Sequence, residues 1–310
     1  MSQKSFPGII SAIFTPFDEK FNFDEQSFRS LIEFQIKAKV DALWFLGSAG
    51  MGPAVDQKLQ ERVLDVGLDQ TKRRIPALAN VGTASTLSSL SLLDYAVKRG
   101  VDGIALLTPF YYMHDEFELY QHYKAIASSV KLPIILYNNP TTTKIDLKPE
   151  FMQRLHSEFP NIIGVKETTA DVHRVILDLV NLPKTFGVYP SFETQILATL
   201  PFGARGVVSP VIPNIFPELI VELARTIADK KWEMAVELQG KCNELSGILA
   251  SSPGTSRYRL VAQEMLAARG LKVSLSVPWA VKPLTKEEAE SVRIRLAKTG
   301  LLEKYGKAKL

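Results

Sequence analysis

Lys166 and Tyr137 are the two side chains whose types and positions suggest covalent chemistry. Each follows a short apolar run, residues 162–165 before Lys166 and residues 133–136 before Tyr137. A lysine at the end of a buried strand loses much of its water, which disfavours the ammonium form. A neutral amine can attack a ketone to form an iminium, an electron sink, and a phenol beside it can shuttle protons. Each residue alone also fits a plainer role: a lysine that reaches solvent or pairs with Glu167, and a tyrosine at the rim of a core.

A turn of small residues and two hydroxyl groups lie at the ends of other apolar runs. The turn Gly47-Ser48-Ala49-Gly50 has N–H groups that could hold a carboxylate, although such residues suit any tight turn. Thr168 comes soon after one run, and Ser209 ends the last. We expect the turn, Thr168 and Ser209 to contact a substrate. The four histidines lack the spacing of metal ligands, and no glycine-rich phosphate loop occurs, so no metal site is predicted.

Eight apolar runs, alternating with amphipathic segments, must position these residues. The runs cover residues 8–14, 40–46, 75–80, 102–107, 133–137, 161–166, 185–189 and 205–209. They are rich in Ile, Val, Leu and Phe without strict alternation, which is typical of strands covered by helices. Helical patterns follow Asp24, Asp56 and Asp171, three expected N-caps, and Gly100 is an expected C-terminal stop. Eight βα units predict an α/β fold, a (β/α)8 TIM barrel with its active site at the carboxyl ends of the strands.

The chain is expected to have two parts. Residues 1–229 would form the barrel that carries the active site, and residues 230–310 a C-terminal helical appendage. Helical patterns in the appendage cover residues 232–249, 256–268 and 286–298. The segment Ser251-Ser252-Pro253-Gly254 is expected to separate the first two of these helices.

Composition narrows the class of protein. Hydrophobic residues make up 46% and charged residues 23% of the 310 residues, the balance of a globular protein. The net charge of +4 arises mostly near the C-terminus, without a basic and aromatic cluster, so no nucleic-acid partner is expected. The single cysteine, Cys242, excludes an intrachain disulfide and fits a reducing compartment. No apolar stretch has the length of a membrane span, and residues 6–17 read as a first strand, so we expect a cytoplasmic protein without membrane association.

Four short segments occur in an order and spacing that match one known family. They are Phe14-Thr15-Pro16-Phe17, Gly47-Ser48-Ala49-Gly50, Tyr137-Asn138-Asn139-Pro140 and Gly164-Val165-Lys166-Glu167-Thr168. The chain therefore resembles the dihydrodipicolinate synthase / N-acetylneuraminate lyase family of class I, pyruvate-type aldolases. Each segment is weak alone, but the ordered set is specific, and the resemblance covers nearly the whole chain.

The resemblance implies a role for each matched residue. Lys166 would be the Schiff-base nucleophile, Tyr137 the proton shuttle, and Ser48 a member of the proton relay. Tyr111 falls on the tyrosine that, in many family members, reaches a neighbouring subunit's site. The family acts on a 2-oxo acid and an aldehyde, needs no metal or organic cofactor, and commonly forms a homotetramer, a dimer of dimers. We expect the same here.

Three single residues depart from the family's pattern, and the segment Pro190-Ser191-Phe192-Glu193 departs from the glycine-containing segment of the sialic acid lyases, which counts against that activity. Ala49 replaces a loop hydroxyl that binds the pyruvate carboxylate, a hydrogen bond worth about 1.5–3 kcal/mol. Met51 replaces a frequent glutamate, and its loop is more similar to that of archaeal-type 2-keto-3-deoxygluconate aldolases. Thr142 stands where dihydrodipicolinate synthases carry an arginine that grips the second substrate's carboxylate. Hydroxyls favour a polyol, so the leading hypothesis is reversible aldol cleavage of a 2-keto-3-deoxy sugar acid, with Thr142 and Thr168 as hydroxyl contacts.

Three other functions are left open by the sequence. A dihydrodipicolinate synthase (4-hydroxy-tetrahydrodipicolinate synthase) would share the Schiff base, although Thr142 counts against it. A dehydratase or deaminase of a 2-oxo acid would use the same iminium. A catalytically silent barrel that binds a 2-oxo acid is favoured by Ala49 and Met51, and opposed by the presence of both Lys166 and Tyr137.

Overall fold

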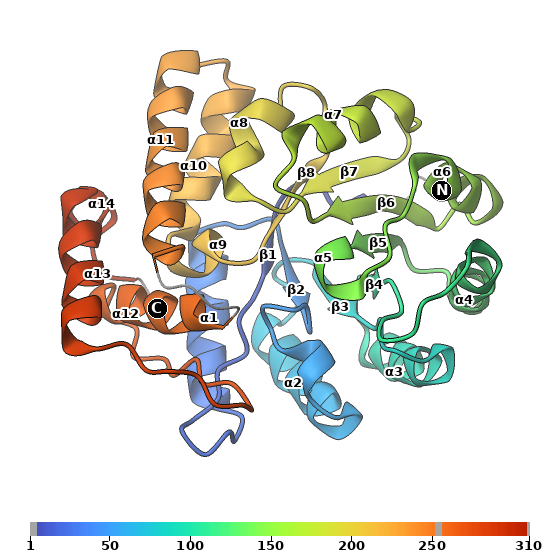
Figure 1. Ribbon diagram of the computed structural model, residues 1–310, viewed down its shortest axis with the longest axis horizontal. Helices are drawn as coiled ribbons and strands as arrows, with labels where there is room; N and C mark the ends of the chain where they lie inside the picture. The colour runs from blue at the N-terminus through green and yellow to red at the C-terminus, as the bar shows by residue number, and fades with distance from the viewer. Residues whose placement is uncertain (1–4, 252–255, 309–310) are drawn as a thin grey trace.

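Eight parallel strands form a nearly closed barrel in the computed structural model, which describes residues 5–251 and 256–308 (Figure 1). The strands are β1 Gly8–Ala12, β2 Ala42–Phe45, β3 Ala77–Asn80, β4 Gly103–Leu107, β5 Ile134–Asn138, β6 Ile162–Glu167, β7 Gly187–Pro190 and β8 Gly206–Ser209. They pair in the order β7-β6-β5-β4-β3-β2-β1-β8. The backbone N–H of Arg205 donates to the Val188 carbonyl at 3.0 Å, which brings the start of β8 beside β7. The predicted TIM barrel and all eight predicted strands are confirmed, with ends shifted by two residues or fewer.

Helices and short helical turns connect the strands. They are α1 Glu25–Lys37, η1 Gly52–Ala54, α2 Gln57–Thr71, α3 Thr86–Arg99, α4 Glu116–Ser129, α5 Pro140–Thr143, α6 Pro149–Glu158, α7 Val172–Asn181, η2 Glu193–Gln195, α8 Ile196–Thr199, α9 Ile212–Ile215 and α10 Pro217–Ala228. The carboxylates of Asp24, Asp56 and Asp171 each accept a hydrogen bond from a backbone N–H of the first helical turn, as predicted. Gly100 ends α3 with φ 84°, a left-handed conformation that glycine adopts readily.

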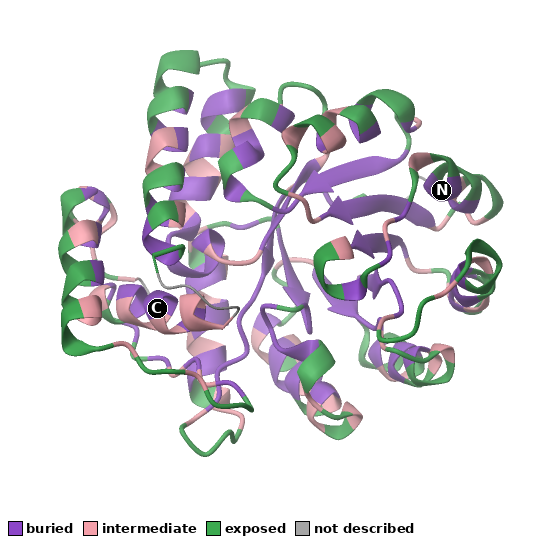
Figure 2. Ribbon diagram, in the orientation of Figure 1, coloured by how far each residue is buried: buried purple, intermediate pink, exposed green. Residues whose placement is uncertain are grey.

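Alternate residues of each strand face the barrel interior, because successive side chains of a strand point to opposite faces. The interior side chains form one cluster: Phe6, Ile10, Ala12, Ala42, Trp44, Leu78, Ala105, Leu107, Ile135, Tyr137, Ile163, Tyr189 and Val208. The other strand residues pack outward against the helices, whose outer faces are exposed (Figure 2). Lys166 shares the interior face with Gly164, whereas Val165 belongs to the outer core.

The C-terminal segment adds four helices at one side of the barrel (Figure 1). They are α11 Trp232–Leu249, α12 Arg257–Ala268, α13 Lys286–Lys298 and α14 Leu301–Tyr305. The three predicted helices are confirmed, and α14 was not predicted. Residues 252–254 of the expected separator lie outside the described residues. Buried side chains of α11, α12 and α13 join the core between barrel strands and helices, and Leu275 forms a backbone bridge with Phe17 near the end of β1. The C-terminal segment therefore reaches the mouth of the barrel.

Candidate active site

Lys166 lies inside the carboxyl end of the barrel, next to Tyr137. The two residues are direct partners in the pairing of β6 with β5. The Lys166 Nζ lies 4.1 Å from the centre of the Tyr137 ring and 5.2 Å from that of Trp44. Lys166 is only 2% exposed, and the described residues contain no carboxylate in an ion pair with it. The plainer alternatives, a lysine that reaches solvent or pairs with Glu167, therefore do not fit the structure.

The Tyr137 hydroxyl lies at the centre of a short relay. It shares a hydrogen bond of 3.2 Å with the Ser48 hydroxyl and accepts one of 3.4 Å from the Asn139 amide. Burial raises the pKa of Tyr137, but the nearby Lys166 charge and the hydrogen bond with Ser48 outweigh it, so the net pKa lies below its ordinary value of 10.0. A phenol with a lowered pKa beside an amine is suited to exchanging protons with it. The structure thus brings together three predicted catalytic residues.

The turn Gly47-Ser48-Ala49-Gly50 forms a compact loop beside this relay. The N–H of Met51 donates to the Ser48 carbonyl at 3.1 Å, and the N–H of Gly52 donates to the Gly47 carbonyl at 3.2 Å. A Cβ on Gly52 would lie 1.9 Å from the Leu46 carbonyl oxygen, so only glycine fits there. Within the described residues, the N–H groups of Ala49 and Gly50 donate to no acceptor. They are therefore available to an anionic group such as a carboxylate.

A buried guanidinium that sequence reasoning missed lies behind the loop. Arg259 of α12 is 1% exposed and donates to the carbonyls of Ala49 at 2.5 Å, Thr15 at 3.2 Å and Leu275 at 3.1 Å. No carboxylate in the described part of the chain forms an ion pair with Arg259, and burial lowers its pKa. A hydrogen bond to the Ala49 carbonyl polarises the peptide group that ends in the Gly50 N–H. Arg259 thus positions the loop and places positive charge behind it.

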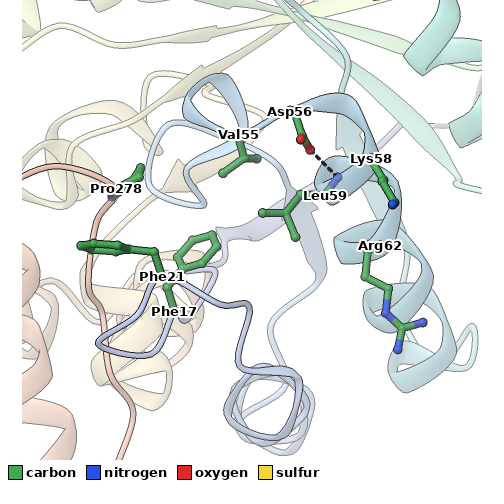
Figure 3. Close-up of a pocket in the computed structure, with 8 residues that line it drawn as sticks. All are labelled: Phe17, Phe21, Val55, Asp56, Lys58, Leu59, Arg62 and Pro278. Carbon is green, nitrogen blue, oxygen red and sulfur yellow. Dashed lines mark hydrogen bonds between the residues drawn. The ribbon is translucent and has the colours of Figure 1, made fainter.

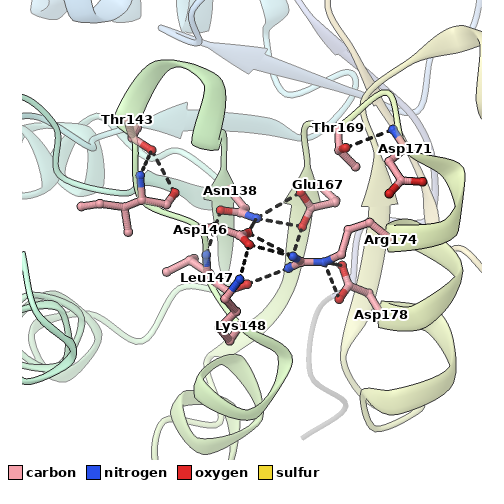
Figure 4. A network of polar contacts seen from close by, with 11 residues as sticks. Asn138, Thr143, Asp146, Leu147, Lys148, Glu167, Thr169, Asp171, Arg174 and Asp178 are labelled. Atoms are coloured by element: carbon pink, nitrogen blue, oxygen red, sulfur yellow. Dashed lines mark hydrogen bonds and ion pairs between the residues drawn. The ribbon is translucent and has the colours of Figure 1, made fainter.

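A network of charged groups fixes the outer side of the strands that carry Tyr137 and Lys166 (Figure 4). The Asn138 amide donates to both Glu167 oxygens at 3.0 and 2.9 Å. The Arg174 guanidinium contacts Asp146 at 3.0 Å, Asp178 at 3.2 Å and Glu167 at 3.6 Å. Burial raises the pKa of Glu167 to about 8 and that of Asp178 to about 6. Sequence reasoning missed this network, because only Arg174 and Asp178 have the i,i+4 spacing of a helical pair and the other members come from different elements.

The structure places the remaining predicted residues in different surroundings. The Thr168 hydroxyl is buried and has no partner among the described residues, so it is available to a substrate. The Thr142 hydroxyl donates to the Asn139 carbonyl at 3.2 Å. Ser209 follows the inward-facing Val208 and therefore faces outward, where its hydroxyl donates to Glu193. The structure does not bring Ser209 to the Lys166 site.

Tyr111 lies outside this group, on the surface. It is 85% exposed, has the unusual φ of 81° for a non-glycine residue, and stacks edge to face with Tyr112 at 5.0 Å. Met113 and Phe117 nearby are also largely exposed. An exposed apolar group of this kind suits contact with another protein surface. Within one chain, Tyr111 does not complete the relay of Ser48 and Tyr137.

A cavity of about 230 Å³ opens beside Ser48. Its lining consists of Ser48, Met51, Pro53, Ala54, Leu107, Phe110, Thr142, Thr143 and Trp279. A larger pocket of about 420 Å³ lies elsewhere, between Phe17, Phe21 and the start of α2 (Figure 3). Its carboxylate, Asp56, caps α2. Neither cavity is lined by Lys166 or Tyr137, but Ser48, which is bonded to Tyr137, lines the smaller one and not the larger. The chemistry therefore points to the smaller cavity.

Neither a cluster of metal ligands nor a membrane-spanning helix occurs in residues 5–251 and 256–308. This part of the chain contains no group of three or more His, Cys, Asp or Glu side chains that could hold a metal ion. It also contains no helix long and apolar enough to cross a membrane.

Comparison with known proteins gives one consistent family. Residues 5–299 match the model of the dihydrodipicolinate synthetase family. The chain is 30% identical to the 4-hydroxy-tetrahydrodipicolinate synthase of Sulfurihydrogenibium sp., over 96% of this chain and 100% of the relative. It is 30% identical to that of Bacillus subtilis, over 93% and 97% of the two chains.

Solved structures agree with the sequence comparisons. YagE from E. coli K12, a prophage protein of the dihydrodipicolinic acid synthase family solved in complex with pyruvate, superposes with a TM-score of 0.91 at 27% identity, covering 96% of this chain and all of YagE. A structure described as the first monomeric dihydrodipicolinate synthase variant superposes with a TM-score of 0.86 at 28% identity, covering 96% and 98% of the two chains.

Proposed function

This chain belongs to the dihydrodipicolinate synthetase family of class I, Schiff-base lyases, and on that premise we propose that it joins pyruvate, or a pyruvate-derived 2-oxo acid, reversibly to an aldehyde. The observation that carries the proposal is the buried pair of Lys166 and Tyr137, with Nζ 4.1 Å from the ring centre. A buried amine beside a phenol suits iminium formation, since burial favours the neutral amine and the phenol can transfer protons.

The proposed reaction assigns a step to each group. The Lys166 amine attacks the keto carbon, and the resulting carbinolamine loses water to give the iminium. Loss of a proton from the methyl group gives the enamine, which attacks the aldehyde carbon. Tyr137 and Ser48, 3.2 Å apart, transfer the proton that the aldehyde oxygen gains, and water releases the product from Lys166.

The carboxylate of the 2-oxo acid is proposed to bind the loop that contains Ala49. The free N–H groups of Ala49 and Gly50 are its donors, and the Arg259 charge behind the loop favours an anion there. The Arg259 charge therefore offsets part of the binding free energy that is lost because the Ala49 side chain cannot donate a hydrogen bond to the carboxylate. The silent-barrel alternative drew support from Ala49, and this second source of anion binding weakens that support.

The identity of the aldehyde separates the remaining enzyme candidates. Relatives named 4-hydroxy-tetrahydrodipicolinate synthase favour that activity as the second candidate. The sugar-acid hypothesis relied on the hydroxyls of Thr142 and Thr168, and the Thr142 hydroxyl is already bonded to the Asn139 carbonyl. The structure therefore gives the polyol fewer partners than the sequence suggested.

We also propose that the protein forms a homotetramer, a dimer of dimers. Exposed Tyr111, Tyr112 and Phe117 are the apolar surface that a dimer would cover. In such a dimer, Tyr111 would reach the neighbouring subunit's relay, as the family resemblance implies. A neighbour described as monomeric shows that the fold alone does not determine assembly.

Borohydride trapping tests the proposed chemistry directly. The protein is incubated with pyruvate and sodium borohydride, and the mass of the intact chain and of its peptides is measured. We expect one pyruvate-sized adduct on Lys166, none in Lys166→Ala, and an unchanged adduct in the exposed-lysine control Lys144→Ala. Absence of any adduct with pyruvate and with a panel of 2-oxo acids would refute the Schiff base. Release of pyruvate together with an aldehyde from the condensed product would exclude a dehydratase or deaminase.

A further inference from the structure

We infer that the acceptor aldehyde carries a small apolar substituent, branched aliphatic or aromatic, instead of a polyol chain or a second carboxylate. This inference rests on the proposed function, because it concerns the second substrate of the same site. It arises from the cavity beside Ser48, which we call the acceptor chamber and define by its nine lining residues.

The acceptor chamber lies where the aldehyde must bind. Ser48 lines it, and the Ser48 hydroxyl is 3.2 Å from the Tyr137 hydroxyl, which in turn lies beside Lys166. Ser48 is the member of the relay that lines the acceptor chamber, and Lys166 and Tyr137 do not line it. We therefore expect an aldehyde whose oxygen receives its proton through Ser48 to extend its substituent into this space. The lining of the acceptor chamber therefore decides which substituents are accepted.

Six of the nine lining residues are apolar. They are Met51, Pro53, Ala54, Leu107, Phe110 and Trp279. No lysine, arginine, aspartate or glutamate is among the nine. A carboxylate on the acceptor would therefore enter a mostly apolar space with no charged partner among its nine lining residues, which is unfavourable.

The three lining hydroxyls already have partners. Ser48 shares its hydrogen bond with Tyr137. The Thr142 hydroxyl donates to the Asn139 carbonyl at 3.2 Å, and the Thr143 hydroxyl lies 3.1 Å from the same carbonyl. Because the Thr142 and Thr143 hydroxyl hydrogens are used in these bonds, the two threonines can accept from a polyol hydroxyl but offer its oxygens no donor. Polyol oxygens left without a donor oppose binding. An apolar substituent has no such requirement.

Two of the walls come from residues held in place, Met51 by its backbone and Trp279 by a side-chain hydrogen bond. Met51 has φ 60°, rare for a residue with a side chain, and the Ala54 N–H donates to its carbonyl at 3.0 Å. Trp279 reaches the acceptor chamber from the C-terminal segment, and its indole N–H donates to the Ser256 hydroxyl at 3.1 Å. The indole nitrogen therefore has a protein partner, and the apolar ring remains for a ligand.

The size of the acceptor chamber limits the substituent. Its volume of about 230 Å³ lies below the range of about 300–1,000 Å³ typical of sites for drug-sized ligands. A branched chain of a few carbons or a single aromatic ring is the class of substituent that this volume and lining favour.

A panel of aldehydes tests the inference with the full-length protein. Condensation with pyruvate is measured for 3-methylbutanal, benzaldehyde, D-glyceraldehyde and L-aspartate 4-semialdehyde. We expect kcat/KM for 3-methylbutanal and benzaldehyde to exceed that for D-glyceraldehyde and L-aspartate 4-semialdehyde. The expected difference is on the order of tenfold to a hundredfold, the range by which apolar pockets discriminate between substrates. Equal or higher kcat/KM for glyceraldehyde or the semialdehyde would overturn the inference.

Variants connect the preference to the acceptor chamber. Trp279→Ala should lower kcat/KM for benzaldehyde by about tenfold while leaving that for glyceraldehyde within about twofold. The matched control is Trp232→Ala, since Trp232 is also 47% exposed but lies outside the acceptor chamber. An equal effect of both substitutions, or none from Trp279→Ala, would contradict the assignment of this wall.

Pyruvate trapping distinguishes failure of the inference from failure of the proposed function. Borohydride trapping without aldehyde should label Lys166 equally in the wild type, Trp279→Ala and Trp232→Ala. Normal trapping combined with preference for a polyol or carboxylated aldehyde overturns the apolar acceptor alone. Loss of trapping in the wild type overturns both.

Discussion

Replacing Tyr137 with phenylalanine should nearly abolish turnover while leaving the barrel intact. The phenylalanine ring keeps the edge-to-face contact with Trp44, whose centre lies 5.6 Å away, and the position under the Lys166 Nζ. Only the hydroxyl is lost, and with it the bonds to Ser48 and Asn139. The change therefore separates proton transfer from packing.

The magnitudes of the two effects differ clearly. A positioned proton shuttle contributes about 10²- to 10⁴-fold to rate, which corresponds to about 3–5.5 kcal/mol. The loss of two neutral hydrogen bonds, of which one leaves the buried Asn139 amide unpaired, should cost about 2 kcal/mol of stability. For a chain of 310 residues, this corresponds to a decrease in Tm of about 4 °C or less.

Steady-state condensation, borohydride trapping and thermal unfolding would be measured on the same preparations. The matched control is Tyr189→Phe, because Tyr189 is equally buried, lies in the same interior cluster and pairs with Lys166 from β7. Tyr189 makes no hydrogen bond with Ser48 or Lys166. We expect Tyr189→Phe to retain kcat within about threefold, since no proton shuttle is removed. Equal losses in both variants, or normal kcat in Tyr137→Phe, would refute the reasoning.

Three further predictions concern Arg259, Glu167 and Tyr111. Arg259→Leu leaves three buried carbonyls without a donor, so the free energy of unfolding, measured in urea, should fall by on the order of 3–6 kcal/mol. The KM for pyruvate should also rise, because the loop that binds its carboxylate loses a support. An unchanged KM would argue against a role of Arg259 in positioning the loop. Because burial raises the pKa of Glu167 from 4.5 to about 8, the folded protein retains a proton that the unfolded chain loses, and stability should fall as pH rises through this window. In Glu167→Gln, the free energy of unfolding should decline less between these pH values than in the wild type, and parallel curves would contradict the assignment. Tyr111→Ala should weaken subunit association, measured by sedimentation, by about tenfold or more. Turnover should fall, whereas pyruvate trapping on Lys166 should be retained. An unchanged assembly would exclude Tyr111 from the interface.

The sequence was sufficient to predict the barrel and the neighbouring positions of Lys166 and Tyr137. Eight apolar runs without strict alternation predicted eight buried parallel strands, because strands covered on both faces need apolar side chains on both. Lys166 and Tyr137 each lie one residue before the end of neighbouring strands, and parallel strands place their carboxyl ends on one side. Local order along the chain therefore determined that these two residues meet.

The tertiary structure decided which nearby residues belong to the site. Ser209 ends a strand as Lys166 nearly does, but a shift of one residue in a strand moves a side chain to the opposite face, and Ser209 faces outward. The sequence suggested that the Thr142 hydroxyl could contact a substrate, but in the structure it donates to the Asn139 carbonyl. Strand ends have uncertainties of one or two residues in a sequence, which is enough to reverse such assignments.

Contacts across long sequence separations decided the rest. Arg259 in an amphipathic helical pattern looks like a surface residue, yet it is buried and bonded to the Ala49 carbonyl 210 positions earlier in the chain. Trp279 likewise reaches the acceptor chamber from beyond the barrel. The sequence alone determined the fold and the neighbouring positions of Lys166 and Tyr137, since these follow from local patterns. The charge behind the loop and the apolar acceptor chamber depend on burial and partners that only the folded chain brings together.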